Sequence, residues 1–161
     1  MTEVDRLETL TSSELGSLFE TAQQTDVDQA VSILKLIASR AYADEDYETM
    51  ATWNQRLAEF AEENLRMDIA ADARRLTGLA HFLQDKESLA LSHFEIAESI
   101  NETLGRDAEI LDCLINQMDC YECLENHRKV IQTGERALNI ARVSQNFWLA
   151  GQISLKIAKS H

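Results

Sequence analysis

The segment RRLTGLAHFLQDKESLALSHFEIAESI, residues Arg74 to Ile100, decides the fold of this chain. Apolar residues recur at intervals of three and four on both sides of a short polar break at Gln84 to Glu87. This spacing is typical of amphipathic helices, so the segment predicts two helices separated by a turn. None of its residues is an obvious catalytic group.

Five positions of this segment recur along the chain. In the segment they hold Gly78, His81, Ala90, Phe94 and Ala97. Forty residues later they hold Met118, Tyr121, Val130, Gly134 and Ala137. Thirty-nine residues earlier they hold Ser39, Tyr42, Ala51, Gln55 and Ala58, and a fourth copy begins at Ala158 and His161. We expect the small residue to let two antiparallel helices approach, the aromatic residue or His to fill the adjacent space, and the Ala-type positions to close the hairpin. Since one hairpin cannot bury its second apolar face alone, the copies should stack.

Proline is absent and the five glycines are never adjacent, so the sequence lacks the punctuation of a chain of β-hairpins. We therefore expect helices throughout, with Thr11 to Glu14 forming a capping box and Asp26 capping the next helix. The expected helices span about 12–24, 27–43, 46–63, 67–84, 87–104, 107–124, 127–143 and 146–161.

Composition narrows the class of protein. The chain has 161 residues, 45% of them hydrophobic, which is enough for one domain with a real core. Its net charge of −13 would repel the phosphates of a nucleic acid or an anionic membrane surface, so neither is an expected partner. The N-terminus has no signal-peptide pattern, and three cysteines without framework spacing fit a reducing compartment. These features predict a cytoplasmic protein.

The repeated pattern resembles the tetratricopeptide repeat (TPR) family, in its long variant of about 40 residues per repeat found in bacterial signalling proteins. The resemblance covers about residues 27–161 and implies an all-α, right-handed superhelical stack of antiparallel helix hairpins. It implies one TPR-like domain over residues 1–161, with a cap helix at about 12–24, repeats at about 27–63, 67–104 and 107–143, and a partial repeat at 146–161. The sequence lacks the repeat-ending proline of the short form, and Gly134 and Gln55 stand where the family has an aromatic residue. The alternative is an unrelated helical bundle with an accidental period.

The resemblance also implies a noncatalytic scaffold whose inner helices line a concave groove for a protein or peptide. By the family pattern, the groove receives Arg40, Asp44, Asp72, Arg75, Leu79, Phe82, Asp112, Asp119, Glu122, Gln152 and Lys159. Its middle would be acidic above an apolar floor, which favours a basic or amphipathic partner. Family members that clamp a C-terminal carboxylate have Lys and Asn where this chain has Arg75, Leu79, Ile115 and Asp119, so that clamp is not expected. The alternative is that these charges are only a solvated face.

Family analogy further suggests the N-terminal regulatory part of a longer signalling protein, followed by a diguanylate cyclase, kinase or transcription-factor domain. A stand-alone peptide-sensing regulator is the second hypothesis. No glycine-rich phosphate loop or di-iron Glu-x-x-His pair is present in the sequence, and we expect no enzyme activity and no cofactor.

Cysteine chemistry is the third hypothesis. Cys113, Cys120, Cys123 and His127 have a spacing that could serve a metal or redox site. However, Cys113 and Cys120 occupy places where the repeat uses small packing residues, so we expect structural cysteines and no metal. His81 aligns with Tyr42 and Tyr121, which indicates a packed histidine and not a general base.

The last segment, NFWLAGQISLKIAKSH, is apolar at helical spacing, but the sequence ends before a second helix could cover it. We expect that the chain is a piece of a longer protein, or that this helix packs against a second copy in a homodimer.

Overall fold

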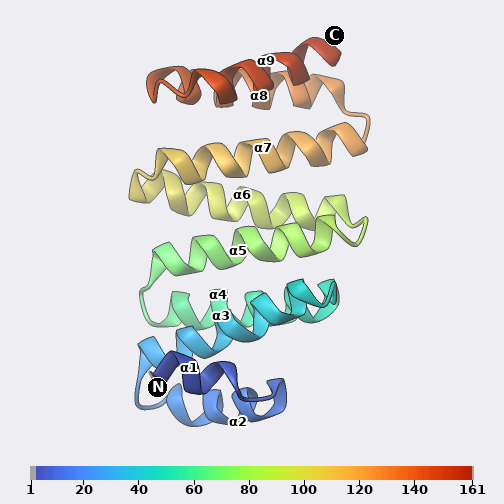
Figure 1. Ribbon diagram of the computed structural model, residues 1–161. Coiled ribbons are helices and arrows are strands. Elements are labelled where there is room, and N and C mark those ends of the chain that lie inside the picture. The colour runs from blue at the N-terminus through green and yellow to red at the C-terminus, as the bar shows by residue number, and fades with distance from the viewer. Residues whose placement is uncertain (1–2, 161) are drawn as a thin grey trace.

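A computed structural model describes residues 3–160, and within that range it contains nine α-helices and no strand. The helices are α1 (Glu3–Glu8), α2 (Ser12–Ala22), α3 (Val27–Ala43), α4 (Tyr47–Glu63), α5 (Met67–Phe82), α6 (Glu87–Leu104), α7 (Asp107–Cys123), α8 (His127–Val143) and α9 (Phe147–Lys159). From α2 onward each helix packs against the next along the chain, and the helices stack as rungs with the two ends of the chain at opposite ends (Figure 1). The all-α hairpin stack expected from the sequence is confirmed.

The local signals at helix starts are also confirmed. Thr11 caps α2 in a capping box, in which the Glu14 carboxylate accepts a 2.7 Å bond from the Thr11 amide. Asp26 caps α3 by accepting a 3.0 Å bond from the amide of Gln29. The eight expected helices lie within two residues of their expected bounds, and α1 is an additional short helix. His161, expected to begin the fourth copy with Ala158, lies outside the described residues.

Each turn from α3 to α9 repeats one backbone conformation every 20 residues. The positive-φ residues are Glu45, Leu65, Asp85, Gly105, Glu125 and Gln145. The amide after each of them bonds a carbonyl five residues back, as from Asp46 to Ala41 at 2.9 Å, which satisfies an orphan carbonyl at the helix end. Among these six residues only Gly105 is a glycine, so the scarcity of glycine did not prevent tight turns.

The helix starts correct the register expected for the first copy. Helices α3, α5, α7 and α9 begin at residues 27, 67, 107 and 147, so the spacing is 40 throughout and the 39-residue shift is wrong. Ser39 and Tyr42, expected to pack the repeat, are exposed, as is Gln55. The buried residues at the true equivalent positions are Ala38, Ala41, Met50, Asn54 and Leu57. Ala51 and Ala58 are buried as well, because they lie next to Met50 and Leu57 on the inner face of α4.

In the second and the third hairpin a small residue on one helix faces a large residue on the other. The helix that carries the small residue differs between the two hairpins. Gly78 on α5 faces Phe94 on α6, and a Cβ added at Gly78 would lie 2.7 Å from the Phe94 ring. In the third hairpin the large residue is Met118 on α7 and the small one is Gly134 on α8, with 2.9 Å between an added Cβ and the Met118 methyl. The other buried members of the pattern are Ala90, Ala97, Val130 and Ala137, while His81 and Tyr121 are half-buried.

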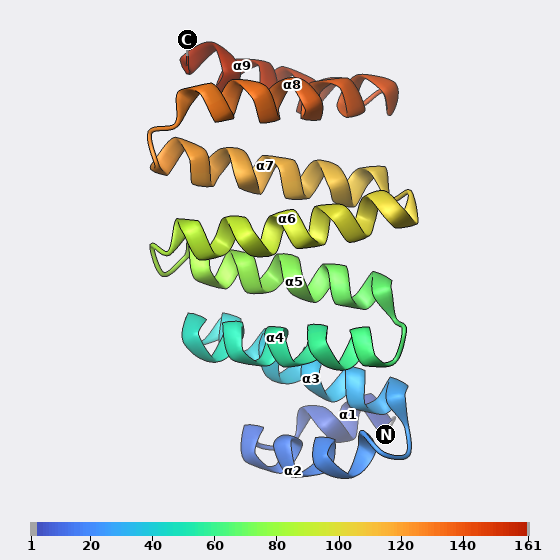
Figure 2. The same ribbon diagram turned by 180° about the vertical axis from the view of Figure 1, so that it is seen from behind.

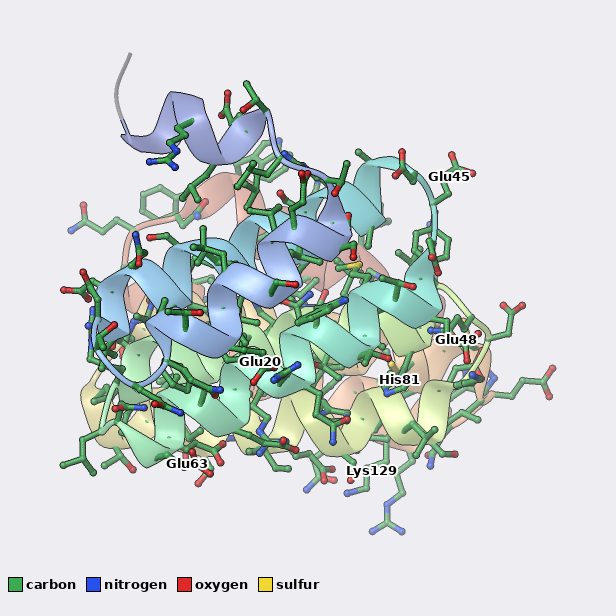
Figure 3. All side chains as sticks on the ribbon, turned by 90° about the horizontal axis from the view of Figure 1, so that it is seen from below. Glu20, Glu45, Glu48, Glu63, His81 and Lys129 are labelled. Carbon is green, nitrogen blue, oxygen red and sulfur yellow. The ribbon has the colours of Figure 1, made fainter. Side chains whose placement is uncertain are left out.

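Charged side chains lie around the outside of the stack. The view along its long axis shows Glu45, Glu48, Glu63 and Lys129 at the periphery (Figure 3). The view from behind shows α4 in front of α3, α6 in front of α5 and α8 in front of α9 for part of their length (Figure 2). Within residues 3–160 no helix combines the length and the apolar character needed to cross a bilayer.

Candidate ligand-binding groove

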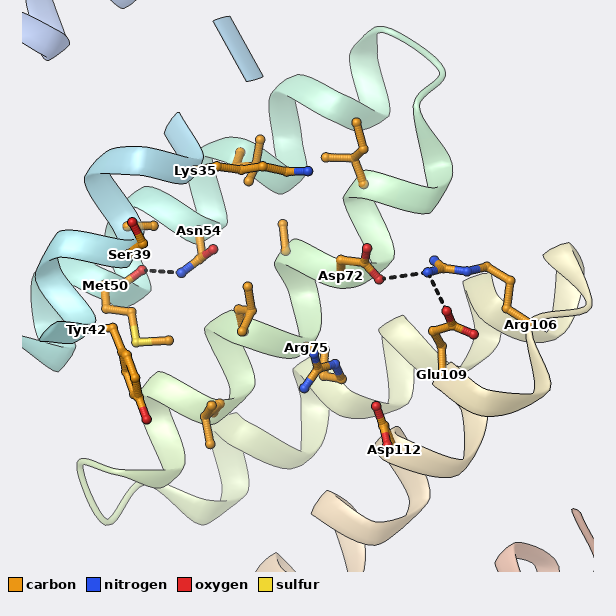
Figure 4. Close-up of a pocket in the computed structure, with 16 residues that line it drawn as sticks. Lys35, Ser39, Tyr42, Met50, Asn54, Asp72, Arg75, Arg106, Glu109 and Asp112 are labelled. Atoms are coloured by element: carbon orange, nitrogen blue, oxygen red, sulfur yellow. Dashed lines mark hydrogen bonds and ion pairs between the residues drawn. The ribbon is translucent and has the colours of Figure 1, made fainter. Parts of the chain in front are cut away.

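A cavity with a volume of about 610 Å³ is lined by residues of α3, α4, α5 and α7 together with Arg106, which precedes α7 (Figure 4). A site of this size is in the range of small-molecule and peptide pockets. Its apolar floor contains Ala38, Met50, Leu57, Ile69, Ala73, Leu76 and Leu79. Its polar lining contains Lys35, Ser39, Tyr42, Asn54, Asp72, Arg75, Arg106, Glu109 and Asp112.

One arginine neutralises the acidic side of the cavity. Arg106 precedes α7 and donates to Asp72 of α5 at 3.2 Å and to Glu109 of α7 at 2.9 Å. It also donates to the Asp68 carbonyl at 3.2 Å and to the Asn101 amide oxygen at 3.1 Å. Burial acts to lower the pKa of Arg106, but the two carboxylates outweigh it and raise that pKa. Arg106 therefore joins the ends of three helices and satisfies two of the three acids in the lining.

Two other cations have no such partner. Lys35 of α3 and Arg75 of α5 make no hydrogen bond or ion pair with the described residues, and both line the cavity. Figure 4 shows Lys35 reaching in from the α3 side and Arg75 from the side of Asp112. Burial raises the pKa of Asp112, Arg75 opposes that shift, and Glu109 adds to it. The three cations and three carboxylates of the lining thus balance in formal charge, but Lys35 and Arg75 form no ion pair.

Four of the residues expected in the groove line this cavity, namely Asp72, Arg75, Leu79 and Asp112. Asp119 and Glu122 lie further along α7 and form ion pairs with Lys156 of α9, the Glu122 pair at 2.6 Å. Phe82 is half-buried against Ala90, Phe94 and Cys120. Lys159 and Gln152 are exposed on α9, outside the cavity.

Arg40 and Asp44 do not line this cavity. The Arg40 guanidinium donates to the carbonyls of Leu10, Leu7 and Glu8, so it closes the C-terminal end of α1. Asp44 follows the last turn of α3 and is exposed. The 40-residue spacing of the repeats explains the difference. The positions 40 residues before Arg75 and Leu79 are Lys35 and Ser39, and both of these residues line the cavity. The strict 40-residue period is the signal that would have identified Lys35, Ser39 and Tyr42.

The protonation state of the buried cysteines argues against a metal or redox site. Cys113 and Cys120 are buried, and burial raises the pKa of each thiol to about 12. A metal or redox site requires thiolate, which is scarce at such pKa values. Cys123 and His127 are exposed at the turn between α7 and α8. Among residues 6–160, whose side chains the structure describes, no three His, Cys, Asp or Glu side chains are grouped so that they could hold a metal ion.

His81 is a packed residue on α5. Its ring stacks on that of His93 of α6, with centroids 5.4 Å apart and an angle of 26° between the planes. The Nδ1 atoms of both rings are buried without a hydrogen-bond partner. Burial is the main cause that lowers both pKa values, and Lys86 adds to the effect at His81.

Comparison with known proteins shows the fold alone. No protein-family model matches the sequence, and no curated protein is significantly similar to it. Among solved structures, the chain is similar to the apo form of RapI, with a TM-score of 0.75 and 14% sequence identity. The match covers 85% of this chain and 49% of the RapI chain, so this chain spans about half the length of that protein.

Proposed function

We propose that this protein is a noncatalytic scaffold that binds a protein or peptide segment in its concave groove. The observation that carries the proposal is the cavity of about 610 Å³ between α3, α4, α5 and α7, which combines an apolar floor with several charged groups. Peptide recognition commonly uses an apolar groove for side-chain anchors and a few polar groups for orientation.

The cavity does not contain an evident catalytic pair. Its carboxylates at Asp72 and Glu109 are held by Arg106, Asp112 lies beside Arg75, and the only lining hydroxyls are Ser39, which donates to the Leu36 carbonyl, and Tyr42. Neither a histidine nor a cysteine is among the lining residues. Binding without chemistry is therefore the function that this site fits best.

A regulatory role in a longer signalling protein rests on the family resemblance alone. We propose it as the biological setting of the groove, with a stand-alone peptide-sensing regulator as the alternative. Sequencing the complete reading frame separates the two, because a catalytic or DNA-binding domain after His161 is expected only for the first.

Binding can be tested with a synthetic library of random, N-acetylated and C-amidated dodecapeptides. We expect selected peptides to lose at least about tenfold in affinity, or about 1.4 kcal/mol, for Tyr42→Asp. Tyr42 lines the cavity and is 53% exposed, so the substitution should leave the fold intact.

The matched control is Val143→Asp, at an 80% exposed residue in the last turn of α8. Peptides that bind both variants as well as the unchanged protein, or a library that yields no binder, would contradict the proposal.

A further inference from the structure

The charged groups of the groove that lack an internal ion pair indicate the charge of the partner. This inference rests on the proposed function. The sequence suggests an acidic groove and a basic or amphipathic partner. In the structure, Asp72 and Glu109 share Arg106, and Asp119 and Glu122 share Lys156. A basic ligand at these four carboxylates would have to displace Arg106 or Lys156, so it would exchange one ion pair for another with little net gain. Asp112 forms no ion pair, but it already interacts electrostatically with Arg75.

Lys35 and Arg75, in contrast to these carboxylates, have no ion-pair partner within the described residues. Neither forms an ion pair or hydrogen bond with the described part of the chain, and both line the cavity. They occupy the same position in successive repeats, 40 residues apart on α3 and α5. Leu76 and Leu79 on the same α5 helix belong to the apolar floor. Lys35 has no charged partner among the described residues, whereas Arg75 interacts electrostatically with Asp112 without forming an ion pair, so a ligand carboxylate at Arg75 competes with Asp112 alone.

We propose that the groove selects an acidic peptide segment in which carboxylate side chains flank an apolar residue. The apolar side chain sits on the floor formed by Met50, Leu76 and Leu79, and the flanking carboxylates pair with Lys35 and Arg75. Arginine can hold a carboxylate through two parallel N–H donors, while lysine offers a single charged centre. Recognition uses internal side chains, so it needs no free C-terminus.

The net charge of −13 opposes the approach of an acidic partner from a distance. At physiological ionic strength, however, charges more than about 8 Å away are largely screened. Contact with two unpaired cations beside an apolar floor therefore decides the affinity, whereas the net charge mainly slows association.

The dodecapeptide library tests this directly, because its blocked ends leave side chains as the only source of charge. We expect the selected peptides to be enriched in Asp and Glu next to Leu, Ile, Phe or Met. Their affinity, measured by isothermal titration calorimetry, should fall about tenfold or more for the double variant Lys35→Gln/Arg75→Gln.

The matched control is Arg128→Gln/Arg142→Gln, which removes the same charge from two exposed positions of α8. Circular dichroism should show that both double variants remain folded. Equal losses in the two double variants would indicate a general charge effect and overturn the inference.

The remaining outcomes separate this inference from the proposed function. Selected peptides that are basic or uncharged, and that still lose affinity for Tyr42→Asp, would overturn the acidic partner and leave the groove as the binding site. Peptides unaffected by Tyr42→Asp, or a library without binders, would overturn both. Acidic peptides sensitive to Lys35 and Arg75 would support both.

Discussion

The space available for an added Cβ atom differs between Gly78 and Gly151. A Cβ at Gly78 would lie 2.7 Å from the Phe94 ring and 3.1 Å from the Ala90 carbonyl oxygen, and the latter is backbone that cannot rotate away. Gly151, in the middle of α9, has no neighbour within 4 Å of such an atom. The same substitution should therefore have opposite effects at the two positions.

We expect Gly78→Ala to lower the free energy of unfolding by about 1–3 kcal/mol through overpacking. Gly151→Ala should raise it by about 0.5–1 kcal/mol, because alanine loses less backbone entropy in a helix. Urea unfolding followed by circular dichroism at 222 nm measures both. A Gly78→Ala variant as stable as the unchanged protein would contradict the close packing of α5 on α6.

The stacked histidines predict a dependence of stability on pH. Burial lowers the pKa of His81 and His93 below the ordinary value of about 6.5, so the unfolded chain takes up protons first as the pH falls. Their contribution is therefore fully present above pH 6.5 and is lost progressively below it.

Replacing His81 with Tyr, the residue at the equivalent Tyr121 position, removes one of the two groups. We expect the melting temperature of His81→Tyr to fall less between pH 7 and pH 5 than that of the unchanged protein. The exposed His127, replaced by Gln, is the control and should leave this difference unchanged. Identical pH profiles for all three proteins would show that the stacked pair does not titrate as proposed.

At the scale of single elements, the turns carry a conformational cost. Leu65, between α4 and α5, is 85% exposed and has a φ of 59°. Residues other than Gly, Asn and Asp rarely adopt this left-handed backbone conformation. Its side chain gains little from packing in return. The equivalent position between α6 and α7 holds Gly105, at a φ of 67°.

We expect Leu65→Gly to raise the free energy of unfolding by about 0.5–1 kcal/mol, because glycine adopts this conformation without steric cost. Thermal unfolding by calorimetry gives the change. Leu89→Gly, in the first turn of α6, is a helical control and should be destabilising. A loss of stability for Leu65→Gly would mean that the exposed leucine contributes packing that outweighs its strained backbone.

For the whole molecule, α9 carries several exposed apolar side chains. Phe147 and Trp148 of α9 are each 72% exposed, and Leu155 on the same helix is also exposed. Ile153 of the same helix is buried, so it is unsuitable for testing association by substitution. We propose that two copies associate weakly through α9, since exposed apolar side chains gathered on one helix favour contact.

Light scattering over a range of concentrations should then show a dimer that dissociates on dilution. Trp148→Glu should shift the protein to a monomer, whereas Leu89→Glu, at an exposed apolar residue of α6, should not. A strict monomer at every concentration would contradict the association.

The amino-acid sequence by itself determined the helices, the hairpin stack and the packing positions of the second and third repeats. These features depend on the spacing of apolar residues and on short-range capping groups, which act within a few turns of the chain. The capping residues Thr11 and Asp26 could be predicted for the same reason.

Only the tertiary structure decided the register of the first repeat and the charge of the groove. Met50 and Ala51 are both buried, as are Leu57 and Ala58, so the apolar pattern of α4 fits two registers one residue apart. The ion pairs join residues 34 to 37 positions apart, from Arg106 to Asp72 and from Lys156 to Glu122 and Asp119. Stacking of successive repeats brings these groups together, and it decides which carboxylates are neutralised and which cations remain free to bind.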